Sequence, residues 1–261
     1  LSFFPLGPIL RRGGAFFIKR SFAGKKLYSA LVDAYIRKLL VEGYPIEFFV
    51  EGGRSRTGKL LPPKYGLLSM VVDAAMVLKA RRVFFVPISI GYERIVEERS
   101  YVHELSGGEK KEENVGGLLR SSTILRSKYG RLYVQFGEII DFAKLVEDAR
   151  LEAGVKSDVE LSPKDRRAMI QRLAHSVTYQ IDRATVVTPA ALVASSLLVH
   201  RRRGMTHSEL RATCEKLLDC EGSRAGGSLH AATRVRAAKR AMRMAQPTAA
   251  STCAAAHEAA P

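Results

Sequence analysis

Short apolar runs alternate with segments of helical periodicity in the first half of this chain, and this alternation constrains the fold more than any other feature. Residues 14–18, 46–50, 83–90 and 131–137 have the composition of buried strands, and residues 25–42, 65–80 and 115–128 are typical of the helices between them. Strands that alternate with helices indicate an α/β domain, for which we expect a mixed, mostly parallel sheet flanked by helices. The run at 83–90 is almost wholly apolar, which favours a strand buried on both faces.

The composition of the chain changes after this domain. We expect residues 1–150 to form the α/β domain and residues 151–220 to form a helical C-terminal region, with one helix at 189–199 and another announced by the capping-box spacing of Thr206 and Glu209. Larger aliphatic side chains nearly vanish in residues 221–261, where alanine and arginine dominate. A segment of this composition buries too little apolar surface to form a core, so we predict a disordered tail.

Lysine and arginine outnumber the acidic residues by 42 to 26, which gives a formal net charge of +16. Such a surface attracts anions, whether nucleic acid, anionic lipid head groups or phosphorylated substrates. The sequence contains no recognised nucleic-acid motif, so nucleic acid is the weakest of these three partners. No apolar run approaches the roughly 20 residues of a membrane-spanning helix. The cysteines (Cys214, Cys220 and Cys253) suggest neither a disulfide framework nor a zinc site, and no cofactor signature is present.

A glycine-rich basic segment directly follows the apolar run at 46–50. It contains Glu51, Gly52, Gly53, Arg54, Ser55 and Arg56. The guanidinium groups of Arg54 and Arg56 can each donate two parallel hydrogen bonds to phosphate oxygens, and the glycines let the backbone approach a ligand closely. Glu51 could either steer substrate hydroxyls or hold the arginines in place, and Ser55 could donate one more hydrogen bond. The segment therefore predicts a phosphate-ester binding turn.

Other polar residues also follow predicted strands. Because ligands in such sheets lie beyond the carboxyl ends of the strands, Lys19 and Arg20 and the 91–93 segment are expected to meet the glycine-rich segment at one edge. Lys64 could reach the same anion or could simply be exposed. Pro87 is expected to shape the wall of the pocket, since proline removes a hydrogen-bond donor from a strand.

Three ordered blocks of this sequence, at residues 14–20, 49–56 and 86–93, resemble the glycerol-3-phosphate acyltransferases of the bacterial membrane-associated type. They are similar also to the dihydroxyacetone-phosphate acyltransferases. The resemblance implies transfer of a fatty acyl group from acyl-CoA or acyl carrier protein to the sn-1 hydroxyl of sn-glycerol 3-phosphate, the first step of phospholipid biosynthesis. It also implies a peripheral location at an anionic surface, the cytoplasmic face of the cell inner membrane.

Two groups of alternatives stay open. Dihydroxyacetone phosphate or lysophosphatidate could be the acyl acceptor instead, since both carry the same anionic group. A protein of another class, a non-catalytic binder of phosphate or anionic lipid, also fits the net charge of +16.

The sequence departs from the family pattern at the catalytic motif, which in the family is a histidine followed five positions later by an aspartate. No histidine in this chain has that spacing. We therefore expect an N-terminally truncated fragment whose His/Asp dyad lies upstream of Leu1. Loss of a general base alone typically costs about 10²- to 10⁴-fold in rate, so we predict little or no activity from these residues by themselves.

Overall fold

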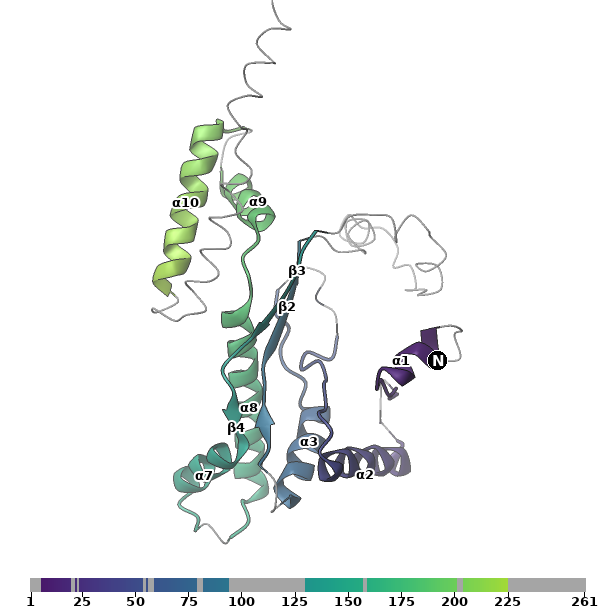
Figure 1. The fold of residues 1–261 in the computed structure, drawn as a ribbon. Helices are drawn as coiled ribbons and strands as arrows, with labels where there is room; N and C mark the ends of the chain where they lie inside the picture. Colours follow the sequence, from purple (N-terminus) through teal and green to yellow (C-terminus); the bar gives the residue numbers. More distant parts are fainter. Residues whose placement is uncertain are drawn as a thin grey trace, which may run out of the picture. The chain divides into compact units, whose positions relative to one another are not determined.

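The computed structural model describes residues 6–19, 22, 24–53, 55, 59–78, 82–93, 130–156, 159–200 and 204–224 (Figure 1). The chain divides into two compact units. The first comprises Leu1–Val86, Ile95–Lys128 and Glu138–Tyr179, and the second comprises Pro87–Arg94, Tyr129–Gly137 and Gln180–Pro261.

The first unit is mostly helical. Its elements are α1 (Leu6–Arg12), α2 (Lys26–Glu42), α3 (Tyr65–Val77), β1 (Phe84–Phe85), β4 (Ile140–Asp141), α7 (Phe142–Ala153) and most of α8 (Pro163–Ala184). The predicted helix at 25–42 is confirmed as α2, which ends at Gly43 because this glycine adopts a left-handed conformation with φ of 84°. The helix predicted from 65 to 80 ends at Val77, and the helix predicted at 115–128 lies outside the described residues.

Helix α3 lies at the centre of the core of the first unit. On one side, Val71 of α3 packs with Ile36 of α2. On the other, Leu68 and Val72 pack with Leu173 of α8, which is fully buried. A helix that is apolar on both sides is expected where it is buried between two neighbours.

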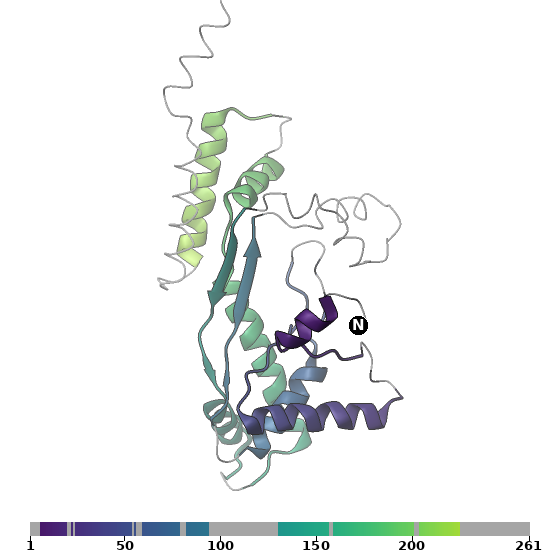
Figure 2. The same cartoon turned by 45° about the vertical axis from the view of Figure 1, so that its right-hand side comes forward.

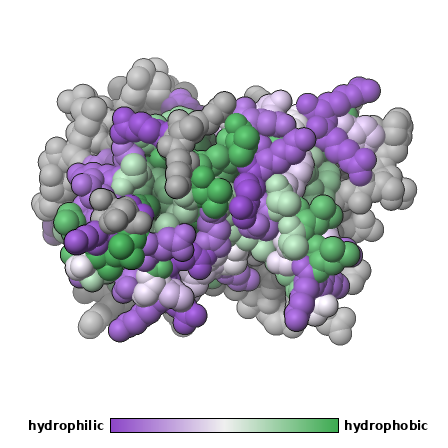
Figure 3. All heavy atoms as spheres, turned by 90° about the horizontal axis from the view of Figure 1, so that it is seen from below, coloured by the Kyte–Doolittle hydropathy of each residue, from purple (hydrophilic) through white to green (hydrophobic). Residues whose placement is uncertain are grey.

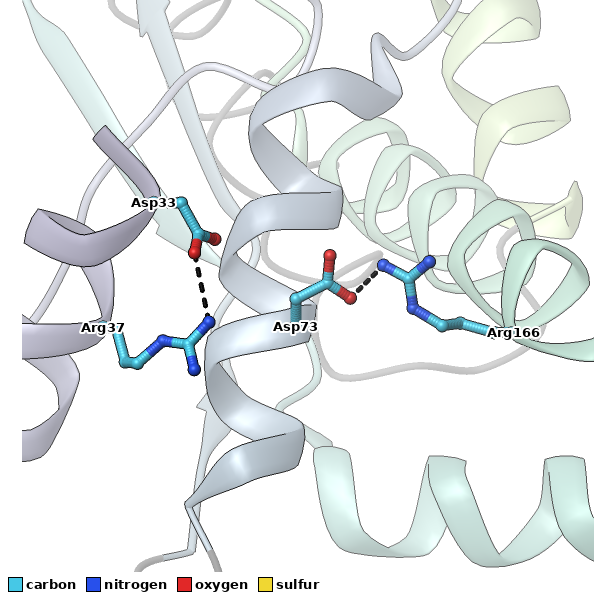
Figure 4. Close-up of polar contacts among 4 residues, drawn as sticks. All are labelled: Asp33, Arg37, Asp73 and Arg166. Atoms are coloured by element: carbon cyan, nitrogen blue, oxygen red, sulfur yellow. Dashed lines mark hydrogen bonds and ion pairs between the residues drawn. The ribbon is translucent and has the colours of Figure 1, made fainter. Parts of the chain in front are cut away.

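Ion pairs accompany this packing. Figure 4 shows Arg166 of α8 paired with Asp73 on α3, so the two helices are joined by charge as well as by apolar contact. Within α2, Arg37 pairs with Asp33 one turn earlier at 3.1 Å.

The strands form antiparallel pairs. Strand β1 pairs with β4 in the first unit, and β2 (Ile88–Tyr92) pairs with β3 (Leu132–Phe136) in the second (Figure 2). The expectation of a mostly parallel sheet is wrong for the described part of the chain, which is mixed helix and strand with two small antiparallel sheets. Residues 15–18 and 46–49 are described but have no strand pairing, while the strand predicted at 131–137 is confirmed as β3.

Proline explains part of this difference. Pro87 has no backbone N–H to donate and separates β1 from β2, so the predicted run at 83–90 forms two short strands. Only one face of this run is covered, because Pro87 and Ser89 are buried while Val86 and Ile88 are exposed. The apolar residues on both faces of this run favoured a strand buried on both sides. In the described part of the chain, however, the face that carries Val86 and Ile88 is exposed.

The second unit contains β2, β3, α9 (Pro189–Val199), α10 (His207–Arg224) and the end of α8. Its small core joins Leu192 of α9 to Cys214 and Leu218 of α10. The predicted capping box is confirmed, since Glu209 N donates to Thr206 Oγ1 at 3.3 Å and Thr206 N donates to Glu209 Oε2 at 2.8 Å.

Candidate phosphate-binding loop

Residues 50–64 form a loop that is closed at its base, and we call this segment the 50–64 loop. Lys64 N donates a hydrogen bond to the Val50 carbonyl at 2.8 Å, so the chain returns to its starting point immediately before α3. Val50 is buried, and Phe48 just before it packs against the core clusters around α3. The apolar run at 46–50 therefore anchors the loop to the core of the first unit.

Gly52 lies in a backbone turn at the start of the loop. Its N–H donates to the Phe49 carbonyl at 3.1 Å, and its φ of +57° lies in the left-handed region. A Cβ atom at this position would lie 3.0 Å from Lys64 Cδ. The predicted residues Gly52 and Lys64 thus lie close together although they are at opposite ends of the loop, and the left-handed backbone conformation favours glycine at position 52.

The carboxylate of Glu51 stabilises the return of the loop. Its Oε2 accepts a hydrogen bond from Leu61 N at 2.9 Å. This contact gives Glu51 a structural role in addition to the two that the sequence left open. Arg54 and Arg56 lie outside the described residues, so their relation to Glu51 stays a prediction.

Ser55 carries a hydroxyl group whose hydrogen-bonding capacity is unused. Among the described residues, Ser55 Oγ and Arg150 Nε are buried side-chain polar atoms with no hydrogen-bond partner. An unsatisfied buried donor typically costs about 1–3 kcal/mol, so such a group in a native fold calls for an explanation. A bound anion that accepts a hydrogen bond from Ser55 would remove this cost.

Lys19 is held against α2. Its backbone N–H donates to Tyr28 Oη at 2.9 Å, and its Nζ lies 5.1 Å from the centroid of the Tyr28 ring. A cation over an aromatic face is favourable, so Tyr28 fixes where this charge lies. Sequence reasoning did not identify Tyr28, because a tyrosine on an amphipathic helix has no distinguishing pattern. Arg20 lies outside the described residues.

The remaining predicted residues belong to the second unit. Pro87 is fully buried, and its carbonyl accepts a hydrogen bond from Gly137 N at 2.8 Å. Its role in the wall of a pocket stays a prediction, as does the meeting of the 91–93 segment with the glycine-rich segment. Glu93 is held by Tyr133 Oη at 2.7 Å and by Arg131 N at 3.0 Å.

These contacts perturb the titration of both side chains. The hydrogen bond from Tyr133, followed by that from the Arg131 backbone, lowers the pKa of Glu93 below its ordinary value of 4.5. The same bond with Glu93 raises the pKa of Tyr133 above 10.0. Glu93 therefore joins the end of β2 to the start of β3.

Comparison with known proteins identifies the family. The family described as the glycerol-3-phosphate acyltransferase C-terminal region matches residues 101–248, more than half of the chain, and the acyltransferase family matches residues 1–91. The chain belongs to the glycerol-3-phosphate acyltransferase family. The match to the C-terminal region continues beyond the end of α10 at Arg224 into the segment predicted as a tail.

Individual glycerol-3-phosphate acyltransferases agree with this assignment. That of Pseudoalteromonas translucida is 39% identical over 216 residues, covering 81% of this chain and 26% of the relative. That of Actinobacillus pleuropneumoniae serotype 5b is 39% identical over 210 residues, covering 80% and 25%, and that of Pseudomonas putida is 38% identical, covering 78% and 25%. The chain spans about a quarter of the length of these relatives.

None of the described helices alone is long and apolar enough to cross a membrane. By length and composition only, the bent pair of α8 and α9, taken together, could do so.

Proposed function

We propose that the 50–64 loop binds the phosphate of sn-glycerol 3-phosphate in an enzyme that acylates the sn-1 hydroxyl of this acceptor. The acyl donor would be acyl-CoA or acyl carrier protein. The observation that carries the proposal is the buried, unpartnered hydroxyl of Ser55, which lies in the sequence between Arg54 and Arg56. Membership of the family supports the choice of glycerol 3-phosphate as the anion.

Each loop residue would have a separate task. Arg54 and Arg56 would donate paired hydrogen bonds to the phosphate, and Ser55 would donate a single one. Lys64, whose side chain lies against Gly52, would add a positive charge. Glu51 would hold the loop in shape through Leu61, and Lys19 with Arg20 would contribute further positive charge.

The reaction also needs a general base. The acceptor hydroxyl attacks the thioester carbonyl, loses its proton and displaces the thiol, and a histidine oriented by an aspartate is suited to take that proton. No histidine here is followed five positions later by an aspartate. We therefore propose that the dyad lies in a segment preceding Leu1.

A chimaera tests the proposed activity and its acceptor. This chain would replace the region that it matches in the glycerol-3-phosphate acyltransferase of Pseudoalteromonas translucida. The value of kcat/KM would then be measured with glycerol 3-phosphate, dihydroxyacetone phosphate and lysophosphatidate as acyl acceptors. We expect the highest value with glycerol 3-phosphate and a raised KM for it in Arg54→Ala and Arg56→Ala. Lys144→Ala, which removes an exposed lysine on α7, is the control and should leave KM unchanged.

Other outcomes of this experiment select an alternative. A higher kcat/KM with dihydroxyacetone phosphate or lysophosphatidate would identify that compound, and not glycerol 3-phosphate, as the acyl acceptor. A folded chimaera that binds glycerol 3-phosphate without transferring an acyl group would favour the non-catalytic phosphate binder.

The proposed location is peripheral, at the cytoplasmic face of the inner membrane. The net charge of +16 supports it, because anionic head groups attract such a surface.

A further inference from the structure

Two tyrosines of α2 hold the segment that carries Lys19. The ring of Tyr35 meets the ring of Phe16 edge-on at a centroid distance of 5.2 Å. Two turns earlier on the helix, Tyr28 Oη accepts a hydrogen bond from Lys19 N at 2.9 Å. Residues seven apart lie on nearly the same side of a helix, so both tyrosines contact the segment from one side of α2.

The spacing of these contacts limits the path of the segment. Seven residues of helix rise by about 10.5 Å, and three residues of fully extended chain span at most about 10–11 Å. Residues 16 and 19 therefore match the two tyrosines when the chain between them is extended and runs in the direction opposite to α2. An extended path leaves little slack, so the backbone at Lys19 is fixed against the helix.

Tyr28 also holds the side chain of Lys19. Lys19 Nζ lies 5.1 Å from the centroid of the Tyr28 ring, which is within the range of a favourable cation–aromatic contact. Figure 3 shows hydrophilic side chains beside apolar ones over one face of the molecule, and an exposed lysine on such a surface adopts many conformations unless a neighbour restrains it. Because the Tyr28 ring restrains the ammonium group, less conformational entropy remains to be lost when an anion binds.

Tyr28 is itself anchored in the core of the first unit. It is half-buried, and it packs against the apolar cluster between α2 and α3. Its ring also lies 5.6 Å from the ring of Phe22. Tyr44 provides a contrast, because it follows the end of α2 and is 58% exposed. A side chain that is fixed by the core and contacts Lys19 at two points is suited to place the charge of that lysine.

We propose that Tyr28 is a positioning residue for Lys19, and that Lys19 contributes most of its affinity for the phosphate of the acyl acceptor when its ammonium group lies on the Tyr28 ring. The inference rests on the role given to Lys19 in the proposed function, and it adds the residue through which that role is exerted. Order imposed before binding raises affinity, because less freedom is lost when the ligand arrives.

A double-mutant cycle between Tyr28 and Lys19 tests the proposal, with the Kd for sn-glycerol 3-phosphate measured by calorimetric titration of the 261-residue chain. Lys19→Ala should bind about tenfold more weakly, since a hydrogen bond to a charged group is lost. Tyr28→Leu should weaken binding about threefold to fivefold, because the cation–aromatic contact is lost. In a chain that already carries Lys19→Ala, Tyr28→Leu should hardly change the Kd.

Further variants separate positioning from a general effect on the fold. Tyr28→Phe keeps the aromatic ring and should bind within about twofold of the unaltered chain. Tyr44→Leu is the control and should leave the Kd unchanged. Circular dichroism shows whether each variant is folded, and Tyr28→Met, which fills a similar volume without a ring, repeats the test if Tyr28→Leu does not fold.

The outcomes distinguish this inference from the proposed function. Equal losses of affinity from Tyr28→Leu with and without Lys19→Ala would overturn the inference alone, because Tyr28 would then act independently of the lysine. Full affinity in Tyr28→Leu or in Lys19→Ala would also overturn it and leave the roles of Arg54 and Ser55 intact. An unaltered chain that does not bind glycerol 3-phosphate would overturn both proposals.

Discussion

Gly52 has a backbone conformation that limits substitution in the 50–64 loop. Its φ of +57° disfavours a side chain, and a Cβ atom added there would lie only 3.0 Å from Lys64 Cδ. Gly52→Ala should lower the free energy of unfolding by about 1–2 kcal/mol and weaken binding of glycerol 3-phosphate. Urea unfolding followed by circular dichroism would measure the first effect, since the chain has no tryptophan.

Gly66→Ala is the matched control for this variant. Gly66 lies in the first turn of α3, where an added Cβ would meet nothing within 4 Å. Alanine is a better helix former than glycine by up to about 1 kcal/mol, so Gly66→Ala should leave stability unchanged or raise it. A Gly52→Ala variant as stable as Gly66→Ala would show that the loop does not need a left-handed residue there.

Glu93 links strands β2 and β3 through the hydrogen bonds that it accepts from Tyr133 and Arg131. Because its folded-state pKa is lowered, the carboxylate stabilises the fold fully above its unfolded value of 4.5, and that contribution is lost as the pH falls through the folded-state pKa. Glu93→Gln should therefore lose less stability than the unaltered chain when the pH is lowered through this range. Unfolding curves at several acidic pH values measure the difference.

Tyr133→Phe provides a second test of the same link. Removal of the hydroxyl should raise the pKa of Glu93 and give an acid sensitivity between those of Glu93→Gln and the unaltered chain. Equal losses of stability on acidification in all three proteins would mean that the hydrogen bonds to Glu93 do not contribute.

Sequence patterns predicted the helices better than the sheet. The ends of α2 and α9 were predicted to within a residue, because apolar periodicity and the terminal Gly43 or the initial Pro189 depend only on nearby residues. Strand pairing depends on residues far apart in the chain, and the apolar run at 83–90 does not specify its partner. Nothing local indicated that β2 pairs antiparallel with β3, since residues 93–131 lie between the two strands in the sequence.

The sequence indicated the candidate site but not its internal contacts. The residue types of the glycine-rich segment predicted affinity for phosphate, and three ordered blocks indicated the family to which the chain belongs. The contact between Lys64 and Gly52 and the bond from Leu61 to Glu51 could not be predicted, because both depend on how the loop closes. The sequence likewise could not predict that the Ser55 hydroxyl is buried without a hydrogen-bond partner, because this depends on how the chain packs.

If the 50–64 loop binds a phosphate ester, calorimetric titration of the chain with glycerol 3-phosphate should detect that binding. Glycerol, which lacks the phosphate, is the control ligand. Ser89→Ala is the control variant, because Ser89 is buried in the second unit but its hydroxyl pairs with Thr185 Oγ1 at 3.0 Å.

We expect opposite results for the two serines. Ser55→Ala should bind glycerol 3-phosphate about tenfold more weakly or worse without losing stability, since a hydrogen bond to a charged group is lost but no internal partner is. Ser89→Ala should lose about 0.5–1.5 kcal/mol of stability and keep its affinity. Unchanged affinity in Ser55→Ala, or a chain that binds glycerol 3-phosphate no better than glycerol, would show that the loop does not bind the phosphate through Ser55.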